Sequence, residues 1–167
     1  MAKYPLEQIA QIKQKRLEEA EKLLKEKKRL LDVEVEKLKK AEEKRDTVKK
    51  HRADKIRKFM EEMDEGTTST KIATHERYIK KVVDEELKVE EKKVSEQVKV
   101  VKKAEEDVNN ARKDHLKKNQ EVEKLQLHKA EWKKEILLEE GKIEAGEADE
   151  MGSNTHALKK RSRHKGG

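Results

Sequence analysis

Residues 10–38 read AQIKQKRLEEAEKLLKEKKRLLDVEVEKL, and apolar residues recur in this stretch at every seventh position. The repeat consists of Ala10, Leu17, Leu24, Leu31 and Leu38, and its phase returns at Phe59. An apolar repeat of seven residues keeps one stripe of an α-helix facing a partner helix. The stretch therefore predicts a long coiled-coil helix.

A second repeat of the same period lies in the other half of the chain. It consists of Leu87, Val94, Val101 and Val108, and its phase holds through Val122, Ile136 and Ile143. The segment GTTST, residues 66–70, separates the two repeats and is the one turn-rich break before residue 141. Because a short loop between two helices makes them antiparallel neighbours, the predicted fold class is all-α, a long two-helix antiparallel coiled-coil hairpin.

Local signals give the expected bounds of the hairpin, which should cover residues 1–146. Pro5 suits the first turn of a helix, and Gly66 suits a C-terminal cap. With a threonine N-cap between positions 70 and 74, we expect helices over about 5–65 and 73–145 and a loop over about 66–72. Glycines at 141, 146 and 152 weaken the helix further on, so residues 147–167 should be a frayed or disordered basic tail.

The composition excludes an ordinary globular domain. Charged residues make up 49% of the 167 residues, hydrophobic residues 32% and aromatic residues only 2%. A globular domain of this length needs a thicker core, whereas high charge with a sustained seven-residue period is typical of coiled coils.

The net charge of +7 is spread over interleaved basic and acidic residues, except for one compact basic block at residues 159–165. Such a block could contact an acidic partner, a membrane surface or nucleic acid. We interpret it as a solvated tail and expect no nucleic-acid partner.

The chain carries no signal for export, membrane insertion or disulfide bonding. It contains no cysteine, so it offers neither a disulfide nor a thiolate metal site. The N-terminal residues lack the apolar run of a signal peptide, and no stretch has the length and apolarity of a membrane span. We expect a soluble cytoplasmic protein.

Two pairing registers, one heptad apart, satisfy the antiparallel arrangement. The first places Leu24 by Ala111, and the second places Ala10 by Trp132. The second is preferred because it matches large residues with small ones at the open end of the hairpin, which carries both termini, and because it leaves a less strained loop. In both registers charged side chains occupy many seam positions, so the seam should be weak.

No pattern in the sequence indicates catalysis. The six histidines include no pair three or four residues apart, which is the spacing of a zinc site on a helix. There is no glycine-rich phosphate loop, and a two-helix hairpin offers no concave pocket that would shift the pKa of a carboxylate. We therefore expect neither an enzyme nor a cofactor-binding protein.

Aromatic and large apolar residues gather near the two ends of the predicted hairpin. At the terminal end Leu137 and Leu138 cannot both share the seam with Ile136, so apolar surface should be exposed there. Either the N-terminal residues fold back over it, or it docks a partner. The terminal-end candidates for partner binding are Tyr4, Leu6, Ile9, Trp132, Ile136 and Leu137. The loop-end candidates, which could also simply cap the hairpin, are Phe59, Met60, Met63 and Tyr78.

The chain resembles the YscO/FliJ family of type III secretion and flagellar export stalk proteins, and within it the chlamydial YscO-like member. The residues that carry the resemblance are the heptad segment 6–21, the turn GTTS at 66–69, and the stretch 111–118 in the second helix. The resemblance covers nearly the whole chain.

This resemblance implies a function that the heptads alone cannot name. Proteins of the family look like the coiled-coil part of a rotary ATP synthase γ subunit. The end bearing both termini would enter the hexameric export ATPase, with Tyr4, Leu6 and Ile9 facing the ring beside Trp132 and its neighbours. The loop end would face the export gate or another partner, and the protein would also bind secretion chaperones. It would be a monomeric hairpin at the cytoplasmic face of the secretion apparatus, without catalytic activity.

Two other functions remain open at this point. One is a generic coiled-coil scaffold or dimeric adaptor, in which helices pair between chains. The other is a basic RNA- or ribosome-associated helical protein, whose binding would fall steeply with salt. The scarcity of aromatic residues counts against base recognition in the second case.

Overall fold

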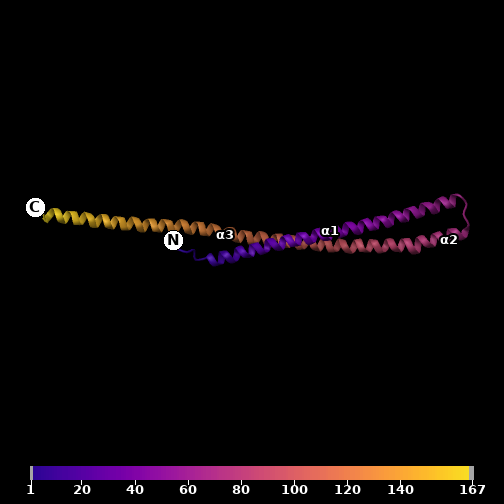
Figure 1. The fold of residues 1–167 in the computed structure, drawn as a ribbon, viewed down its shortest axis with the longest axis horizontal. Helices are drawn as coiled ribbons and strands as arrows, with labels where there is room; N and C mark the ends of the chain where they lie inside the picture. Colours follow the sequence, from indigo (N-terminus) through magenta and orange to yellow (C-terminus); the bar gives the residue numbers. More distant parts are fainter. Residues whose placement is uncertain (1, 166–167) are drawn as a thin grey trace. The chain divides into compact units, whose positions relative to one another are not determined.

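The computed structural model describes residues 2–165, and the side chains of residues 2–161. Its helices are α1 (Glu7–Asp64), α2 (Ser69–Tyr78), the π-helix η1 (Ile79–Val83) and α3 (Asp84–Lys165) (Figure 1). No β-strand occurs within residues 2–165. The predicted all-α class with two long antiparallel helices is confirmed.

Two compact units make up the chain, and each contains a segment of both long helices. The terminal unit comprises Met1–Glu18 and Leu116–Gly167, and the loop unit comprises Glu19–His115. Helices α1 and α3 run antiparallel in each unit, because residue numbers rise along one helix as those of their contact partners fall along the other. The loop unit holds the reversal of the chain.

Contacts between the helices fix the register. In the terminal unit Lys129 Nζ lies 2.8 Å from Glu7 Oε2, and Lys13 Nζ lies 3.1 Å from Glu121 Oε2. In the loop unit Arg52 Nε lies 2.7 Å from Asp84 Oδ1. These pairs agree with the first register, so the preferred second register is wrong.

The physical reason lies at the terminal end. The preferred register would place Ala10 beside Trp132, but the ring of Tyr4 packs there instead, with its centroid 5.3 Å from that of Trp132. Ala10 lines a groove with Leu125. An aromatic pair buries far more apolar area than an alanine against a tryptophan, and the cross-helix ion pairs form in the same register.

The reversal of the chain depends on Gly66. Its φ of 80° lies in the left-handed region, which glycine adopts without steric cost, and its N–H donates to the Met63 carbonyl at 3.2 Å. The hydroxyl of Thr68 then accepts a hydrogen bond from the Lys71 N–H at 3.4 Å as the N-cap of α2. The loop is therefore shorter than predicted, because Thr68 caps the second helix in place of Thr70 or Thr74.

The π-helix η1 changes the phase of the second seam. From Leu87 onward, the least exposed positions of α3 follow the alternating three-and-four spacing of a heptad repeat. N-terminal to Leu87, the least exposed positions are instead spaced four residues apart, at His75, Ile79, Val83 and Leu87. The wider turn of η1 accommodates this one additional residue, and Val83 within it is fully buried.

The core is a narrow seam between two helices, without a third layer. Its most deeply buried apolar residues are Leu17, Ala20, Val83, Val94, Val101, Val108, Ala111 and Val122. A charged residue, Glu90, is buried among them, with Lys93 Nζ at 3.4 Å and Lys44 Nζ at 3.8 Å from its Oε1. Its Oε2 has no hydrogen-bond partner, so this layer of the seam is weaker than an apolar one.

Helix α3 extends further than predicted. It passes through Gly141, Gly146 and Gly152 to Lys165, where the sequence predicted an end near residue 145 and a frayed or disordered tail over 147–167. Glutamates, alanines and lysines between the glycines are strong helix formers, which offsets the cost of about 1 kcal/mol for each glycine. Every side chain described from residue 137 onward is exposed; residues 166 and 167 lie outside the described part.

None of the helices, over the residues that the structure describes, combines the length and apolarity that crossing a lipid bilayer requires.

Candidate functional site

An aromatic cluster joins the N-terminal segment to α3 in the terminal unit. Tyr4 is only 6% exposed, and its ring meets that of Trp132 at an angle of 60°. The Tyr4 hydroxyl forms a hydrogen bond with Nδ1 of His128, one turn earlier on α3. The cluster thus orders a segment that precedes the first helix.

Lys129 completes the cluster from the same face of α3. Its Nζ lies 5.8 Å from the centroid of the Tyr4 ring and 2.8 Å from Glu7 Oε2. The N–H of Glu7 donates to the Tyr4 carbonyl at 3.2 Å. One lysine therefore holds both the aromatic residue and the first residue of α1.

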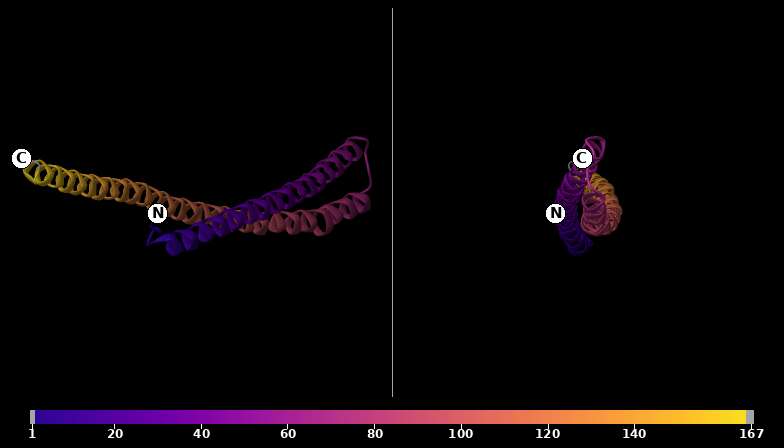
Figure 2. Two further views of the ribbon diagram at one scale, coloured as in Figure 1. Left: turned by 60° about the vertical axis from the view of Figure 1, so that its left-hand side comes forward. Right: turned by 90° about the vertical axis from the view of Figure 1, so that its right-hand side faces the viewer.

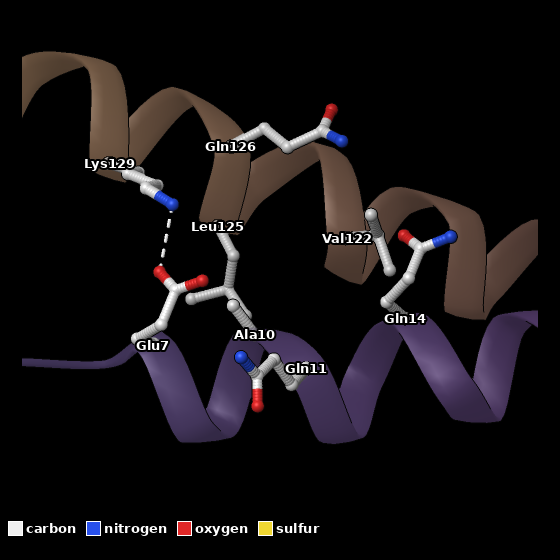
Figure 3. Close-up of a pocket in the computed structure, with 8 residues that line it drawn as sticks. All are labelled: Glu7, Ala10, Gln11, Gln14, Val122, Leu125, Gln126 and Lys129. Atoms are coloured by element: carbon white, nitrogen blue, oxygen red, sulfur yellow. Dashed lines mark hydrogen bonds and ion pairs between the residues drawn. The ribbon is translucent and has the colours of Figure 1, made fainter. Parts of the chain in front are cut away.

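A groove of about 240 Å³ lies beside this cluster (Figure 3). Ala10 and Leu125 face each other between the two helices, and Val122 continues the apolar floor. The remaining lining residues are the three glutamines Gln11, Gln14 and Gln126 and the Glu7–Lys129 ion pair at one end. In a chain that is 49% charged, a groove whose floor and sides are apolar or neutral is unusual.

A wider hollow of about 810 Å³ adjoins the groove and shares Glu7, Gln11 and Lys129 with it. Tyr4 and Trp132 line it together with three lysines, Lys3, Lys129 and Lys133. Among the described residues, neither Lys3 nor Lys133 has an acidic partner within ion-pair distance, so the hollow is electropositive. The terminal unit therefore presents a neutral groove and a basic hollow next to each other.

The structure brings together only part of the predicted terminal-end set. Tyr4 and Trp132 are in contact, and Tyr4 folds back over α3 as one of the two sequence interpretations required. Leu6 and Ile136 are half-buried. Ile9 and Leu137 are 45% and 55% exposed, so apolar surface remains uncovered at this end as the other interpretation required.

At the loop end the predicted residues are more dispersed. Phe59 is half-buried and its ring lies 6.0 Å from that of His75. Met60, Met63 and Tyr78 are exposed, and Lys55 Nζ lies 5.7 Å from the Tyr78 ring centroid. Phe59 therefore belongs to the seam, and the other three residues form the accessible surface.

Sequence reasoning missed the polar half of the terminal site. His128, Lys129 and Lys133 were not among the candidates, nor were the glutamines of the groove. The register was one signal that could have identified these residues, because only the first register places residues 128–133 opposite the N-terminal segment. The periodic placement of Gln8, Gln11 and Gln14 was a second signal, since it leaves one helix face uncharged.

The electrostatics of the site are those of contact surfaces. The hydrogen bond and positive charge of Lys13 lower the pKa of the Glu121 carboxyl, and this cross-helix pair adjoins Gln14 and Val122 of the groove in sequence. Among the described residues no group of three or more His, Cys, Asp or Glu side chains is placed to hold a metal ion. Exposed apolar and basic side chains beside a partly apolar groove are typical of contact surfaces.

Comparison with known proteins gives one family and one structure. The model of the family described as YscO-like protein matches residues 1–162. A solved structure of CT670 from Chlamydia trachomatis, described there as a candidate YscO homologue, is 46% identical in sequence. The similarity covers 96% of this chain and 99% of that one, with a TM-score of 0.91. Comparison with curated proteins gives no match.

Proposed function

Because the chain belongs to the YscO-like family, we propose that it is a stalk and escort protein of a type III secretion apparatus. It links the export ATPase to the export gate at the cytoplasmic face of the apparatus and binds secretion chaperones. It acts through contacts at the two ends of its hairpin, and it catalyses no reaction itself.

The terminal unit is the proposed docking site for the export ATPase. The observation that carries this assignment is the groove of Figure 3, whose lining is apolar or neutral apart from the Glu7–Lys129 ion pair, in a unit that also exposes Ile9 and Leu137. Apolar side chains that remain exposed within a charged surface are the usual anchors of protein interfaces. Anchors on a rigid helix pair transmit force without a conformational change of their own.

The loop end is the proposed contact for the gate or for chaperones. Met60, Met63 and Tyr78 are exposed there. Methionine side chains adapt to differently shaped partners because they are unbranched and polarizable. A surface of this kind suits the binding of several chaperones better than the rigid aromatic cluster of the terminal unit does.

The experiment compares two variants in binding to the cognate export ATPase. Ile9→Glu combined with Leu137→Glu places charges at the proposed docking surface. Val100→Glu is the matched control, because Val100 is 44% exposed, close to the 45% of Ile9, but lies in the loop unit. We expect the double variant to bind the ATPase at least about tenfold more weakly and the control to bind as the wild type does.

Turnover of the ATPase gives the second measurement. The wild-type chain should change the rate of ATP hydrolysis, and the double variant should not. If the wild-type chain neither co-purifies with the ATPase nor changes its turnover, the stalk function is wrong. If Val100→Glu weakens binding as much as the double variant, the docking site is not in the terminal unit.

A further inference from the structure

The last part of α3 has no packing partner within the terminal unit. From Leu137 to Arg161 every residue is exposed, and Figures 1 and 2 show this stretch continuing as a helix with no other segment beside it. We call residues 137–165 the extension. Local interactions alone stabilise an unpaired helix of this length only weakly. Its surface should therefore show which partner it packs against.

Charge is divided sharply between the two halves of the extension. Residues 139–150 contain six acidic residues and one lysine, and residues 151–165 contain five lysines and arginines and no acidic residue. The two halves therefore carry formal charges of −5 and +5. Elsewhere in the chain basic and acidic residues alternate on a much shorter scale.

An apolar stripe, interrupted by Glu144, runs along the extension. Leu137, Met151 and Leu158 are multiples of seven residues apart, and Ala148 lies beside Met151 on the same face. Met151 and Leu158 are 72% and 65% exposed. The stripe has the spacing of a coiled-coil seam, but no second helix of the terminal unit packs against it.

We propose that the extension binds the extension of a second copy of this chain in an antiparallel pair. A two-fold symmetric interface uses the same surface on both copies, so it requires a self-complementary surface. The −5 half of one copy then lies along the +5 half of the other, and the reverse holds at the opposite end. A parallel pair would place like charges together and is excluded.

The apolar stripe is compatible with the register that the charges favour. When Ala148 faces Leu158 of the second copy, Met151 faces Thr155 of that copy, and the two acidic halves lie opposite the two basic halves. The charges therefore set the direction and the alignment of the pair, and the heptad positions of the stripe are compatible with it. Each hairpin completes its own seam, so this pairing joins hairpins that are already folded and does not depend on the export ATPase.

The test uses the full chain and measures its mass by sedimentation as a function of protein concentration and salt. At high concentration and low salt the mass should rise from 19.6 kDa toward twice that value, and salt should reverse the rise because it screens exposed charges. A mass that stays at 19.6 kDa under those conditions overturns the proposal.

Charge reversal makes the test specific. The acid-reversed variant carries Glu140→Lys, Glu144→Lys and Glu147→Lys, and the base-reversed variant carries Lys159→Glu, Lys160→Glu and Arg161→Glu. Each variant alone should stay monomeric, and an equal mixture should form the heterodimer, because each reversed half then meets an opposite charge. The control carries Glu91→Lys, Glu105→Lys and Glu106→Lys, which are exposed outside the extension, and should self-associate as the wild type does.

Circular dichroism of each variant separates loss of pairing from loss of helix. A helical mixture that remains monomeric overturns the proposal. If the extension instead binds the ATPase or another partner, the reversed variants lose that partner while the wild type shows no rise in mass, and this outcome also overturns it.

Discussion

Tyr4 holds the N-terminal segment against α3 through three kinds of contact. Its ring packs against Trp132, its hydroxyl bonds to His128, and Lys129 lies over its face. Because Tyr4 precedes α1, no heptad position describes it, and the sequence could only suggest that it folds back. The contact depends on side chains that meet across the two helices, so it follows from the register and not from local pattern.

Substitution of Tyr4 should expose Trp132, which is the single tryptophan of the chain. We expect Tyr4→Ala to shift the fluorescence of Trp132 to the red and to increase its quenching by acrylamide, because the ring that covers it is lost. The midpoint of thermal unfolding should change little, since the contact lies at the N-terminal end of the chain and outside the seam between the helices. Tyr78→Ala is the control and should leave the emission unchanged. An unaltered emission in Tyr4→Ala would show that the two rings are apart in solution.

Glu121 gives the terminal unit a dependence on pH. The pKa of its carboxyl is lowered by its hydrogen bond to Lys13 and by the charge of that lysine. Because the pKa is lowered in the folded protein, the ionised Glu121 carboxyl stabilises the fold fully above the ordinary carboxyl pKa. This stabilisation disappears as the pH falls through the lowered pKa. Acid should therefore weaken the pairing of α1 and α3 near the groove.

The variant Glu121→Gln measures this effect. We expect it to be less stable than the wild type at neutral pH and to approach the wild type as the pH falls through the acidic range. Thermal unfolding across that range provides the comparison, with Glu131→Gln at an exposed position as control. A difference that stays constant with pH would exclude an electrostatic origin.

The π-helix η1 is the element that the sequence pattern did not predict. Extending the second repeat backward from Leu87 with strict heptad spacing places Glu76 and Lys80 on the seam, whereas the structure places His75 and Ile79 there. Ordinary helix periodicity assumes a uniform turn, so an additional residue within one turn stays invisible until the packing of both sides is known.

Deletion of Lys81 should convert η1 into regular α-helix. The intervals between Ile79, Val83 and Leu87 would then become three and four, which restores the heptad spacing on both sides. We expect the deletion to keep or raise the free energy of unfolding in urea, although a deletion inside a helix normally rotates the following residues by about 100°. Deletion of Lys102, which lies in a regular part of α3, is the control and should be strongly destabilising. Equal losses in both variants would contradict this assignment.

For the whole molecule, the heptads predicted the two long helices, and the short GTTST break between them predicted the place of the turn and the antiparallel direction. They did not predict the register, because a shift by seven residues leaves every apolar stripe in place. Cross-helix ion pairs and the Tyr4–Trp132 contact decide it, and these depend on single side chains. The same limit explains why the exposed apolar residues of the terminal end were predicted and the glutamine-lined groove was not.

Disulfide trapping tests the register directly, since the chain has no cysteine of its own. We expect Ala10→Cys with Leu125→Cys to form a disulfide on mild oxidation, because both residues line the same groove. Ala10→Cys with Trp132→Cys should remain reduced, since a bridge needs Cα atoms within about 7 Å. Cross-linking of the second pair in place of the first would restore the register that the sequence favoured.

The turn at Gly66 also sets an order for folding. Contacts of α1 and of the segment before it with α3 join residues 32 positions apart at Arg52–Asp84, 63 at Glu34–Gln97, and 124 at Tyr4–His128. Closing a loop costs more entropy as the loop lengthens, so the helices should zip together from the turn toward the chain ends. The aromatic cluster beside the groove is then the last contact to form, and the proposed docking surface is complete only on molecules whose seam has already closed.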